Sequence, residues 1–196
     1  MNWKQTIDLS FKNHERFFLG EGISDSALDV LRAETNFDWP PEFVELYRCH
    51  DGIGIIDKAQ NRVDWLLVPS SQITPYCAAM RDWFSKTHSA IAANFFPFYN
   101  LDYSDAMGYL RSDGKPDSLY HFNHEEYAHS MDQSWEEFLT PVNMKLQEWF
   151  IFVAKVEAEF HPKSEIETKN EIPITTNTIP SLPGQENIDE IIKRWG

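Results

Sequence analysis

Histidines and glutamates lie close together between residues 121 and 129, and their spacing is the first candidate for chemistry. The string His124-Glu-Glu-Tyr-Ala-His129 is similar to the H-E-x-x-H zinc motif, whose two histidines are four residues apart on one helix face. Here they are five apart, which turns them about 140° around a helix axis. A metal site formed by His121 and His124 at a strand end stays an alternative. Surface or hydrogen-bonded histidines are the favoured interpretation, and we predict no metal and no other cofactor.

Acidic side chains concentrate between Phe98 and Phe138. Nine acids against two bases give this stretch a net charge of −7, half of the chain's −14. Three interpretations stay open: a solvated face, a docking face for a basic protein, and a carboxylate pair or calcium site. No D-x-[DN]-x-[DN]-G loop supports the last. The candidate partner-binding residues are Asp102, Asp105, Asp113, Asp117, Glu125, Glu126 and Asp132.

Motifs of enzymatic catalysis are missing from the sequence. It has no G-x-S-x-G nucleophile elbow, and Gly52-x-Gly54 lacks the third glycine of a dinucleotide loop. Cys49 is predicted in the last turn of a helix, where the dipole raises the pKa of a thiol. We therefore predict no catalytic residues and no enzyme. A hydrolase built on Asp102, Asp105, His121 and His124 is kept as an alternative.

Composition and charge restrict the class of protein. The 196 residues are 14% aromatic, which favours one packed domain. A net charge of −14 argues against nucleic acid as a partner and permits a basic protein. No apolar run is long enough for a membrane span, and the N-terminus lacks a signal-peptide pattern. Two cysteines match neither a disulfide framework nor a zinc site, so we expect a cytoplasmic protein with reduced thiols.

A rigid helical corner is predicted between Ser24 and Gly54. Ser24 suits the N-cap of a first helix, and Pro40 requires that helix to end before Trp39. A second helix starts at the prolines, and Gly52 is placed to close it in the left-handed conformation. The apolar face of the second helix is expected to contain Phe43, Leu46, Tyr47 and His50.

The remaining elements follow from changes in periodicity. Residues 1–23 show apolar side chains without a sustained period. Strands are expected within 53–68, over 95–99 and in a hairpin of 106–111 and 118–122 around the turn at Asp113-Gly114. A helix capped by Ser70 or Ser71 should cover 73–88.

The C-terminal part of the chain is expected to contain a long helix, then a linker or disordered tail, then a short helix. Ser134 and Glu137 form a capping box, and Thr140-Pro141 should restart a longer helix. That helix has an apolar seam, expected to pack on the protein's own sheet or to bind a partner: Val142, Leu146, Trp149, Val153, Val156 and Phe160. We predict a domain over 1–160, a linker or disordered tail over 161–186, and a short docking helix over 187–196.

The order of these features resembles a known family. Trp39-Pro40-x-x-Phe43-x-x-x-Tyr47-x-x-x-Asp51-Gly52 is followed by apolar strands ending at Pro69, then by Phe96-Pro97-Phe98, Asp102-Tyr-Ser-Asp105 and Ser134-Trp135-x-x-Phe138-Leu139. The pattern is similar to the SUKH superfamily, specifically its Smi/Knr-type domain, over about residues 20–140. Trp39 and Asp51 replace the leucine and asparagine typical of that family.

The resemblance implies an α+β fold, with helices packed against a mainly antiparallel twisted sheet and no catalytic residues. It also implies an immunity protein that neutralises a cognate toxin, often a nuclease. Regulatory or scaffolding modules of the cell-wall-assembly-regulator type are the alternative. A nuclease must be basic to hold phosphate, so an acidic inhibitor would capture it faster. We therefore expect a basic protein partner, no nucleic acid and no membrane.

Overall fold

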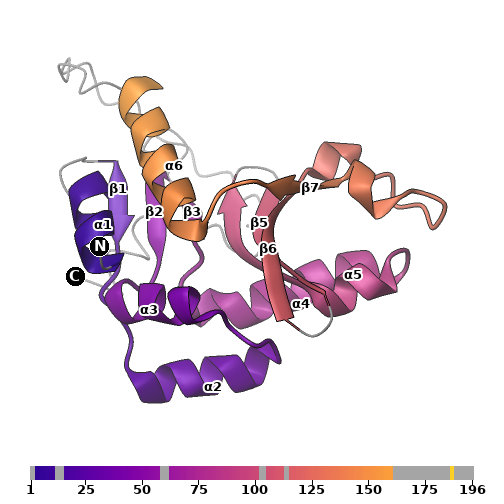
Figure 1. The fold of residues 1–196 in the computed structure, drawn as a ribbon, viewed down its shortest axis with the longest axis horizontal. Helices are drawn as coiled ribbons and strands as arrows, with labels where there is room; N and C mark the ends of the chain where they lie inside the picture. Colours follow the sequence, from indigo (N-terminus) through magenta and orange to yellow (C-terminus); the bar gives the residue numbers. More distant parts are fainter. Residues whose placement is uncertain are drawn as a thin grey trace.

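A twisted antiparallel sheet runs through the molecule, and the chain adds its strands in sequence order (Figure 1). The computed structural model describes residues 3–11, 16–57, 62–101, 105–112, 115–160 and 186–187. Within these residues the order is β1 to β7, and the short strand β8 pairs with β3. The strands are β1 (Phe17–Leu19), β2 (Ile53–Asp57), β3 (Arg62–Leu67), β4 (Phe95–Leu101), β5 (Asp105–Ser112), β6 (Lys115–Phe122), β7 (Leu139–Val142) and β8 (Glu186–Asn187).

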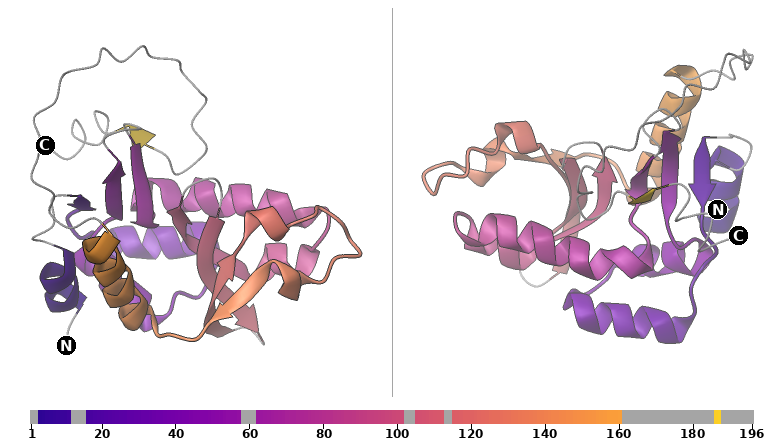
Figure 2. Two further views of the ribbon diagram at one scale, coloured as in Figure 1. Left: turned by 90° about the horizontal axis from the view of Figure 1, so that it is seen from above. Right: turned by 180° about the vertical axis from the view of Figure 1, so that it is seen from behind.

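Helices cover this sheet in two groups. Figures 1 and 2 show α2, α3, α4 and α5 together on one side of the molecule, while α1 and α6 lie beside β1–β3. Their bounds are α1 (Trp3–Phe11), α2 (Asp25–Thr35), α3 (Pro41–Cys49), α4 (Ser70–Ser85), α5 (Ser89–Asn94) and α6 (Leu146–Phe160). The predicted α+β class, with helices on a mainly antiparallel twisted sheet and a C-terminal helix, is confirmed.

The predicted corner is formed by α2 and α3. The Ser24 hydroxyl accepts a hydrogen bond from the Ala27 N–H at 3.3 Å, so the expected N-cap is confirmed. Helix α2 ends at Thr35, before Trp39, and Pro41 begins α3. The predicted apolar face of α3 is buried in full: Phe43, Leu46, Tyr47 and His50.

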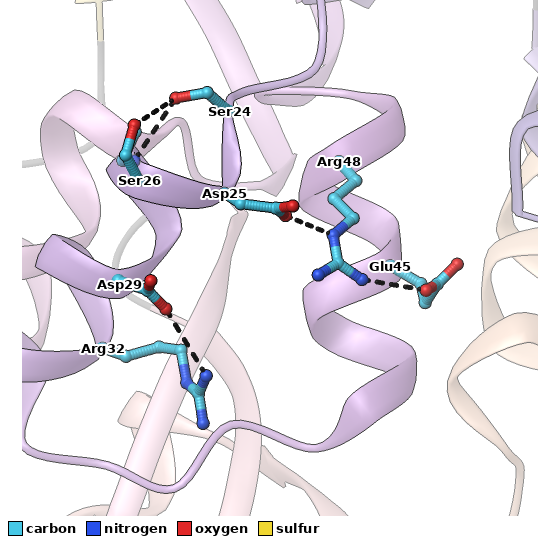
Figure 3. A network of polar contacts seen from close by, with 8 residues as sticks. Ser24, Asp25, Ser26, Asp29, Arg32, Glu45 and Arg48 are labelled. Carbon is cyan, nitrogen blue, oxygen red and sulfur yellow. Dashed lines mark hydrogen bonds and ion pairs between the residues drawn. The ribbon is translucent and has the colours of Figure 1, made fainter.

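An exposed ion pair of Arg48 connects the two helices of the corner, and a second one lies within α3 (Figure 3). Arg48 Nε of α3 lies 2.7 Å from Asp25 Oδ1 of α2, and a second guanidinium nitrogen lies 3.0 Å from Glu45 Oε1. The hydrogen bond from Arg48 to Asp25 raises the pKa of the guanidinium. Because such surface pairs add little stability, the rigidity of the corner must come from its buried side.

An aromatic cluster supplies that buried side. Phe43 is fully buried, and five other rings surround it with centroid distances of 5.0 to 5.9 Å. They come from the corner and from the facing strands β4 and β5: Trp39, Tyr47, Phe96, Phe98 and Tyr109. Edge-to-face pairs of this kind add stability beyond the burial of apolar area. The cluster thus joins the corner to the centre of the sheet.

The segment from Gly20 to Ile23 passes directly against the end of α3. Gly20 N donates to Gly52 O, and Ile23 N donates to Tyr47 O, both at 3.0 Å. In the opposite direction, Asp51 N donates to Glu21 O at 3.0 Å. Gly52 has a φ of +91°, which confirms the left-handed conformation expected there. The helix itself ends earlier, because His50 is its C-cap.

Asp51 caps α4 from a distance in sequence. Its carboxylate accepts hydrogen bonds from the Ser70 N–H at 2.6 Å and from the Ser70 hydroxyl at 2.7 Å. The prediction that Ser70 or Ser71 caps this helix is wrong, because the N-cap position belongs to Pro69 and Ser70 already lies in the helix. A buried carboxylate at a helix N-terminus also interacts favourably with the helix dipole. Asp51 therefore fixes the corner to α4.

Replacing Asp51 with alanine should lower the free energy of unfolding by about 2 kcal/mol, since two donors lose their acceptor at a helix N-terminus. Urea unfolding followed by tryptophan fluorescence measures this loss. Asp38→Ala is the control, because Asp38 is exposed and lies 3.9 Å from Arg32. The control should change the value by less than about 0.5 kcal/mol. Equal losses in the two variants would show that Asp51 does not cap α4.

The predicted strands are confirmed, and several helix predictions need correction. β2, β3, β4 and the hairpin of β5 and β6 lie where they were expected, although the turn at 113–114 lies outside the described residues. Within 1–23, helix α1 and strand β1 were not predicted. The helix predicted over 73–88 begins at Ser70 and ends at Ser85, and α5 follows it.

The long C-terminal helix starts later than predicted. Residues 139–142, expected to lead into it, form β7 and pair with β6 from Phe122↔Leu139 to Leu119↔Val142. Pro141 is tolerated there because β7 is the last strand of the sheet order, and such strands need fewer N–H donors. In α6, Trp149 contacts Tyr99 of β4, so this part of the predicted seam packs on the sheet. Val142 lies in β7, and the side chain of Phe160 lies outside the described residues. Residues 161–185 and 188–196 lie outside the described residues, and the predictions for them stay predictions.

Candidate protein-binding surface

The loop from Asn123 to Phe138, hereafter the β6–β7 loop, holds most of the described acidic candidates. It contains two short 3-10 turns, η1 (His124–Glu126) and η2 (Trp135–Glu137). Figures 1 and 2 show it projecting from the end of the molecule opposite α1. A projecting loop on a rigid scaffold is a common position for binding residues.

Tyr127 fastens the middle of this loop to α4. Its hydroxyl donates to Trp83 O at 3.0 Å and shares a hydrogen bond with the Thr87 hydroxyl. Its ring is buried and packs against Phe84 and Phe138. The loop therefore has its own anchor in the hydrophobic core.

Gln133 holds the two halves of the loop together. Its side-chain nitrogen donates to Glu126 O, and its side-chain oxygen accepts from the Ala128 N–H at 2.8 Å. Its carbonyl accepts from His88 Nε2 at 2.8 Å, which places the ring proton on that nitrogen. The capping box of Ser134 and Glu137 is confirmed, although it caps η2 and not an α-helix. These bonds preorganise the loop, which reduces the entropy lost on binding.

Asp105 fixes the start of the loop. Its Oδ1 accepts from the His124 N–H at 3.0 Å and from ring Nδ1 of the same residue at 2.7 Å. His121 Nε2 lies 3.5 Å from Oδ2. Both candidate histidines therefore contact one carboxylate, as predicted by the interpretation that they are hydrogen-bonded side chains. Among the described residues, no group of three histidine, cysteine or acidic side chains could hold a metal ion.

Five acids of the loop are exposed to solvent: Glu125, Glu126, Asp132, Glu136 and Glu137. The loop has no lysine or arginine, so these five side chains give it a formal charge of −5. A hydrogen bond from the Ser134 hydroxyl lowers the pKa of the Glu136 carboxyl. Of the other candidates, Asp102 and Asp113 lie outside the described residues, as does the side chain of Asp117.

Met131 was not among the sequence candidates. Its side chain is 78% exposed, more than any other large apolar side chain described. Methionine adapts its shape to a partner and is common on binding surfaces. The only sequence signal was an apolar residue next to Asp132 in a stretch without helical or strand periodicity.

The two thiols lie outside this surface and are free. Burial raises the pKa of Cys77 to about 12, and its Sγ lies 3.6 Å from Pro97 O. Burial also raises the pKa of Cys49 at the end of α3. The raised pKa of Cys49 agrees in direction with the sequence prediction, which gave the helix dipole as the cause of the shift. Neither thiol has the lowered pKa of a nucleophile.

Cys77 should therefore resist labelling by 5,5′-dithiobis(2-nitrobenzoate) at pH 8 in the folded protein. Cys49 should react slowly, and both thiols should react within the mixing time in 6 M guanidinium chloride. The absorbance of the released thiolate gives both rates. Cys49→Ser and Cys77→Ser variants assign them. Fast labelling of Cys77 in the folded state would contradict its burial.

Comparison with known proteins identifies the family. The sequence model of the SMI1 / KNR4 family (SUKH-1) matches residues 22–140, more than half of the chain. The chain belongs to this family. No curated protein matches it. The SUKH-1 match covers the corner and the strands β2 to β6, and it includes the whole β6–β7 loop.

The SUKH-1 motif residues are structural in this protein. The side chains of Trp39, Pro40, Phe43 and Tyr47 are buried in the corner, and Gly52 supplies the positive φ after it. The family is associated with immunity or cell-wall-related protein-binding roles, and its domains are generally non-enzymatic. No helix in the part of the chain that the structure describes combines the length and apolar character of a membrane span.

Proposed function

We propose that this SUKH-1 protein is an immunity protein that binds and neutralises a cognate toxin, of basic charge and nuclease type. The observation that carries the proposal is a preorganised loop with a formal charge of −5 in a protein of the SUKH-1 family. The free thiols fit a cytoplasmic site of action.

In this proposal the negative charge of the loop raises the rate of association with the toxin. Complementary fields raise association rates by steering the encounter, up to about 10⁸–10⁹ M⁻¹s⁻¹ at low salt. Glu125, Glu126 and Asp132 face solvent and can approach the phosphate-binding surface of a nuclease, while the exposed Met131 of the same loop offers an apolar contact. Asp105 contributes by positioning the loop.

The direct test is co-expression with the product of a neighbouring toxin gene. The proposal expects that the protein restores growth and is recovered with the toxin in a pull-down. A toxin that stays active and unbound in the presence of the protein would overturn it. A scaffolding module of the cell-wall type would instead recover a cellular partner without affecting toxicity.

Charge reversal can distinguish the effect of the loop's acids on toxin association from the effect of the protein's net charge. The triple variant Glu125→Lys, Glu126→Lys, Asp132→Lys should lower the association rate constant with the toxin by about ten-fold at low salt. The matched control Glu21→Lys, Asp29→Lys, Glu45→Lys lies on or near the corner and changes the net charge by the same amount. It should lower the association rate constant by less than about three-fold. Stopped-flow fluorescence at two salt concentrations measures both. Equal losses would assign the effect to net charge and not to the loop.

A further inference from the structure

His88 lies between α4 and α5, and its half-buried ring packs against the β6–β7 loop. The ring centroid lies 4.8 Å from that of Phe138 and 5.9 Å from that of Tyr127. Its Nε2 lies 2.8 Å from Gln133 O. His88 therefore contacts the residues that anchor the loop and hold its two halves together.

The other ring nitrogen of His88 continues into a chain of hydrogen bonds. Nδ1 lies 3.0 Å from the Thr87 hydroxyl oxygen. The Thr87 hydroxyl shares a hydrogen bond with the Tyr127 hydroxyl, which lies 3.0 Å from Trp83 O of α4. Four hydrogen bonds thus run in one line from Gln133 O, through the imidazole and the two hydroxyls, to Trp83 O.

A count of protons shows in which charge state this line is complete. Both of its ends are carbonyl oxygens, which only accept, so the groups between them must supply one proton for each of the four hydrogen bonds. The Thr87 and Tyr127 hydroxyls each supply one. A neutral imidazole adds one more and leaves one bond without a proton, whereas an imidazolium adds two. The whole line therefore forms only when His88 is positively charged.

The neutral ring interrupts the line at one of two places. If Nδ1 accepts from Thr87, Tyr127 must donate to Thr87 and release Trp83 O. If the two hydroxyls keep their other hydrogen bonds, Nδ1 and the Thr87 oxygen face each other as two acceptors, which repel. Each arrangement removes one hydrogen bond from the line that connects the loop to α4.

Other ionisable side chains lie on the elements around His88. Asp82 and Lys86 are at the end of α4, and the β6–β7 loop brings its five acids, His124 and His129, while α5 and β7 contribute none. Within the part of the chain that the structure describes, none of these side chains forms an ion pair with His88. The hydrogen bonds, and not an ion pair, therefore distinguish the two charge states of this ring.

From this proton count we infer that His88 makes the anchoring of the β6–β7 loop depend on pH. As an imidazolium it completes the line and holds the loop on α4. When Nδ1 releases its proton to solvent at higher pH, the anchor loses one hydrogen bond and the loop opens more often. The inference rests on the proposed function only for its consequence, because the regulated loop is the one proposed to bind the toxin.

Hydrogen exchange of two loop amides in the full chain tests the inference. The Tyr127 N–H donates to His124 O at 3.2 Å, and the Ala128 N–H donates to the Gln133 side-chain oxygen at 2.8 Å, so both report opening of the loop. NMR gives their exchange rates at about pH 5.5 and about pH 8.5, on the two sides of the ordinary titration of histidine. Each rate is compared with that of an unfolded peptide at the same pH, which gives a protection factor. Protection should be about five-fold higher at the lower pH, as expected for one hydrogen bond.

Two variants should abolish this pH dependence for different reasons. Thr87→Val removes the hydroxyl that joins the ring to Tyr127, so the charge of His88 no longer affects the anchor. In Tyr127→Phe the Thr87 hydroxyl can donate to the neutral ring or accept from the charged one, so both charge states are satisfied. Both variants should show lower protection than the unmodified protein at the lower pH, and equal protection at the two pH values.

His129→Asn is the control, because it removes another histidine of the loop. Asparagine tolerates the left-handed φ of +52° at this position. The control should keep the five-fold difference, and His124 is present in all of these proteins. Equal protection at the two pH values in the unmodified protein would overturn the inference. So would a five-fold difference that persists in Thr87→Val and Tyr127→Phe, or one that disappears in His129→Asn. Since no toxin is present, this result and that of the pull-down can fail separately.

Discussion

Replacing Phe43 with alanine should lower the free energy of unfolding by about 4 kcal/mol. The side chain is fully buried, and five rings pack around it, so the truncation removes apolar burial and leaves a cavity that rigid aromatic neighbours cannot fill. Urea unfolding followed by tryptophan fluorescence measures the loss. Trp39, which packs on Phe43, should also shift its emission to longer wavelength.

The same substitution at an exposed position is the control. Phe152 in α6 is 49% exposed, and Phe152→Ala should cost less than about 1 kcal/mol. Phe43→Leu should recover part of the loss, because it refills some of the volume. Comparable losses at the two phenylalanines would show that the corner does not depend on the aromatic cluster.

Gly20→Ala should destabilise the protein by about 3 kcal/mol, which is unusual for the addition of one methyl group. A Cβ at this position would lie 1.9 Å from Asp51 O and 2.8 Å from its carbonyl carbon. Both are backbone atoms, so relief requires the segment to move and to lose its hydrogen bond from Gly20 N to Gly52 O. Urea unfolding and hydrogen exchange of the Gly20 and Asp51 amides measure the effect.

The neighbouring residue provides the control for that experiment. Glu21 is exposed and contacts Asp51 through its carbonyl, which alanine retains. Glu21→Ala should therefore change stability by less than about 0.5 kcal/mol. Gly22→Ala should resemble Gly20→Ala, because its Cβ would lie 1.9 Å from Arg48 O. A Gly20→Ala protein as stable as Glu21→Ala would contradict the close approach of the two segments.

The corner could be predicted from sequence because its signals are local. Each signal determines the structure of only a few neighbouring residues. The signals are the N-cap at Ser24, the prolines at 40 and 41, and the buried face at i, i+3, i+4 and i+7. Helix α1 was missed because Leu9 is apolar and yet 69% exposed, while Thr6 is polar and buried. That inversion removes the helical period from the sequence, although Trp3, Ile7 and Phe11 do share a face.

Long-range pairing was the information that the sequence lacked. Nothing around Thr140 shows that Leu139–Val142 pairs with β6, and Pro141 alone suggested a helix start. Likewise, the cap of α4 is 19 residues away in Asp51. The acidic stretch could be found by counting charges, but its division into an anchoring Asp105 and exposed glutamates depends on contacts that no local pattern encodes.

The pairing of β1 with β2 decides how much of the chain must be kept to preserve the family domain. The SUKH-1 match begins at residue 22, whereas Phe17, Phe18 and Leu19 pair with Ile55, Gly54 and Ile53. A protein started at residue 22 would leave the apolar strand β2 as an unprotected sheet edge, which is a template for aggregation. It would also remove Trp3, which packs on Phe150 of α6. The packed structure therefore extends beyond the unit that sequence comparison recognises, and truncation studies of the proposed toxin interaction should keep α1 and β1.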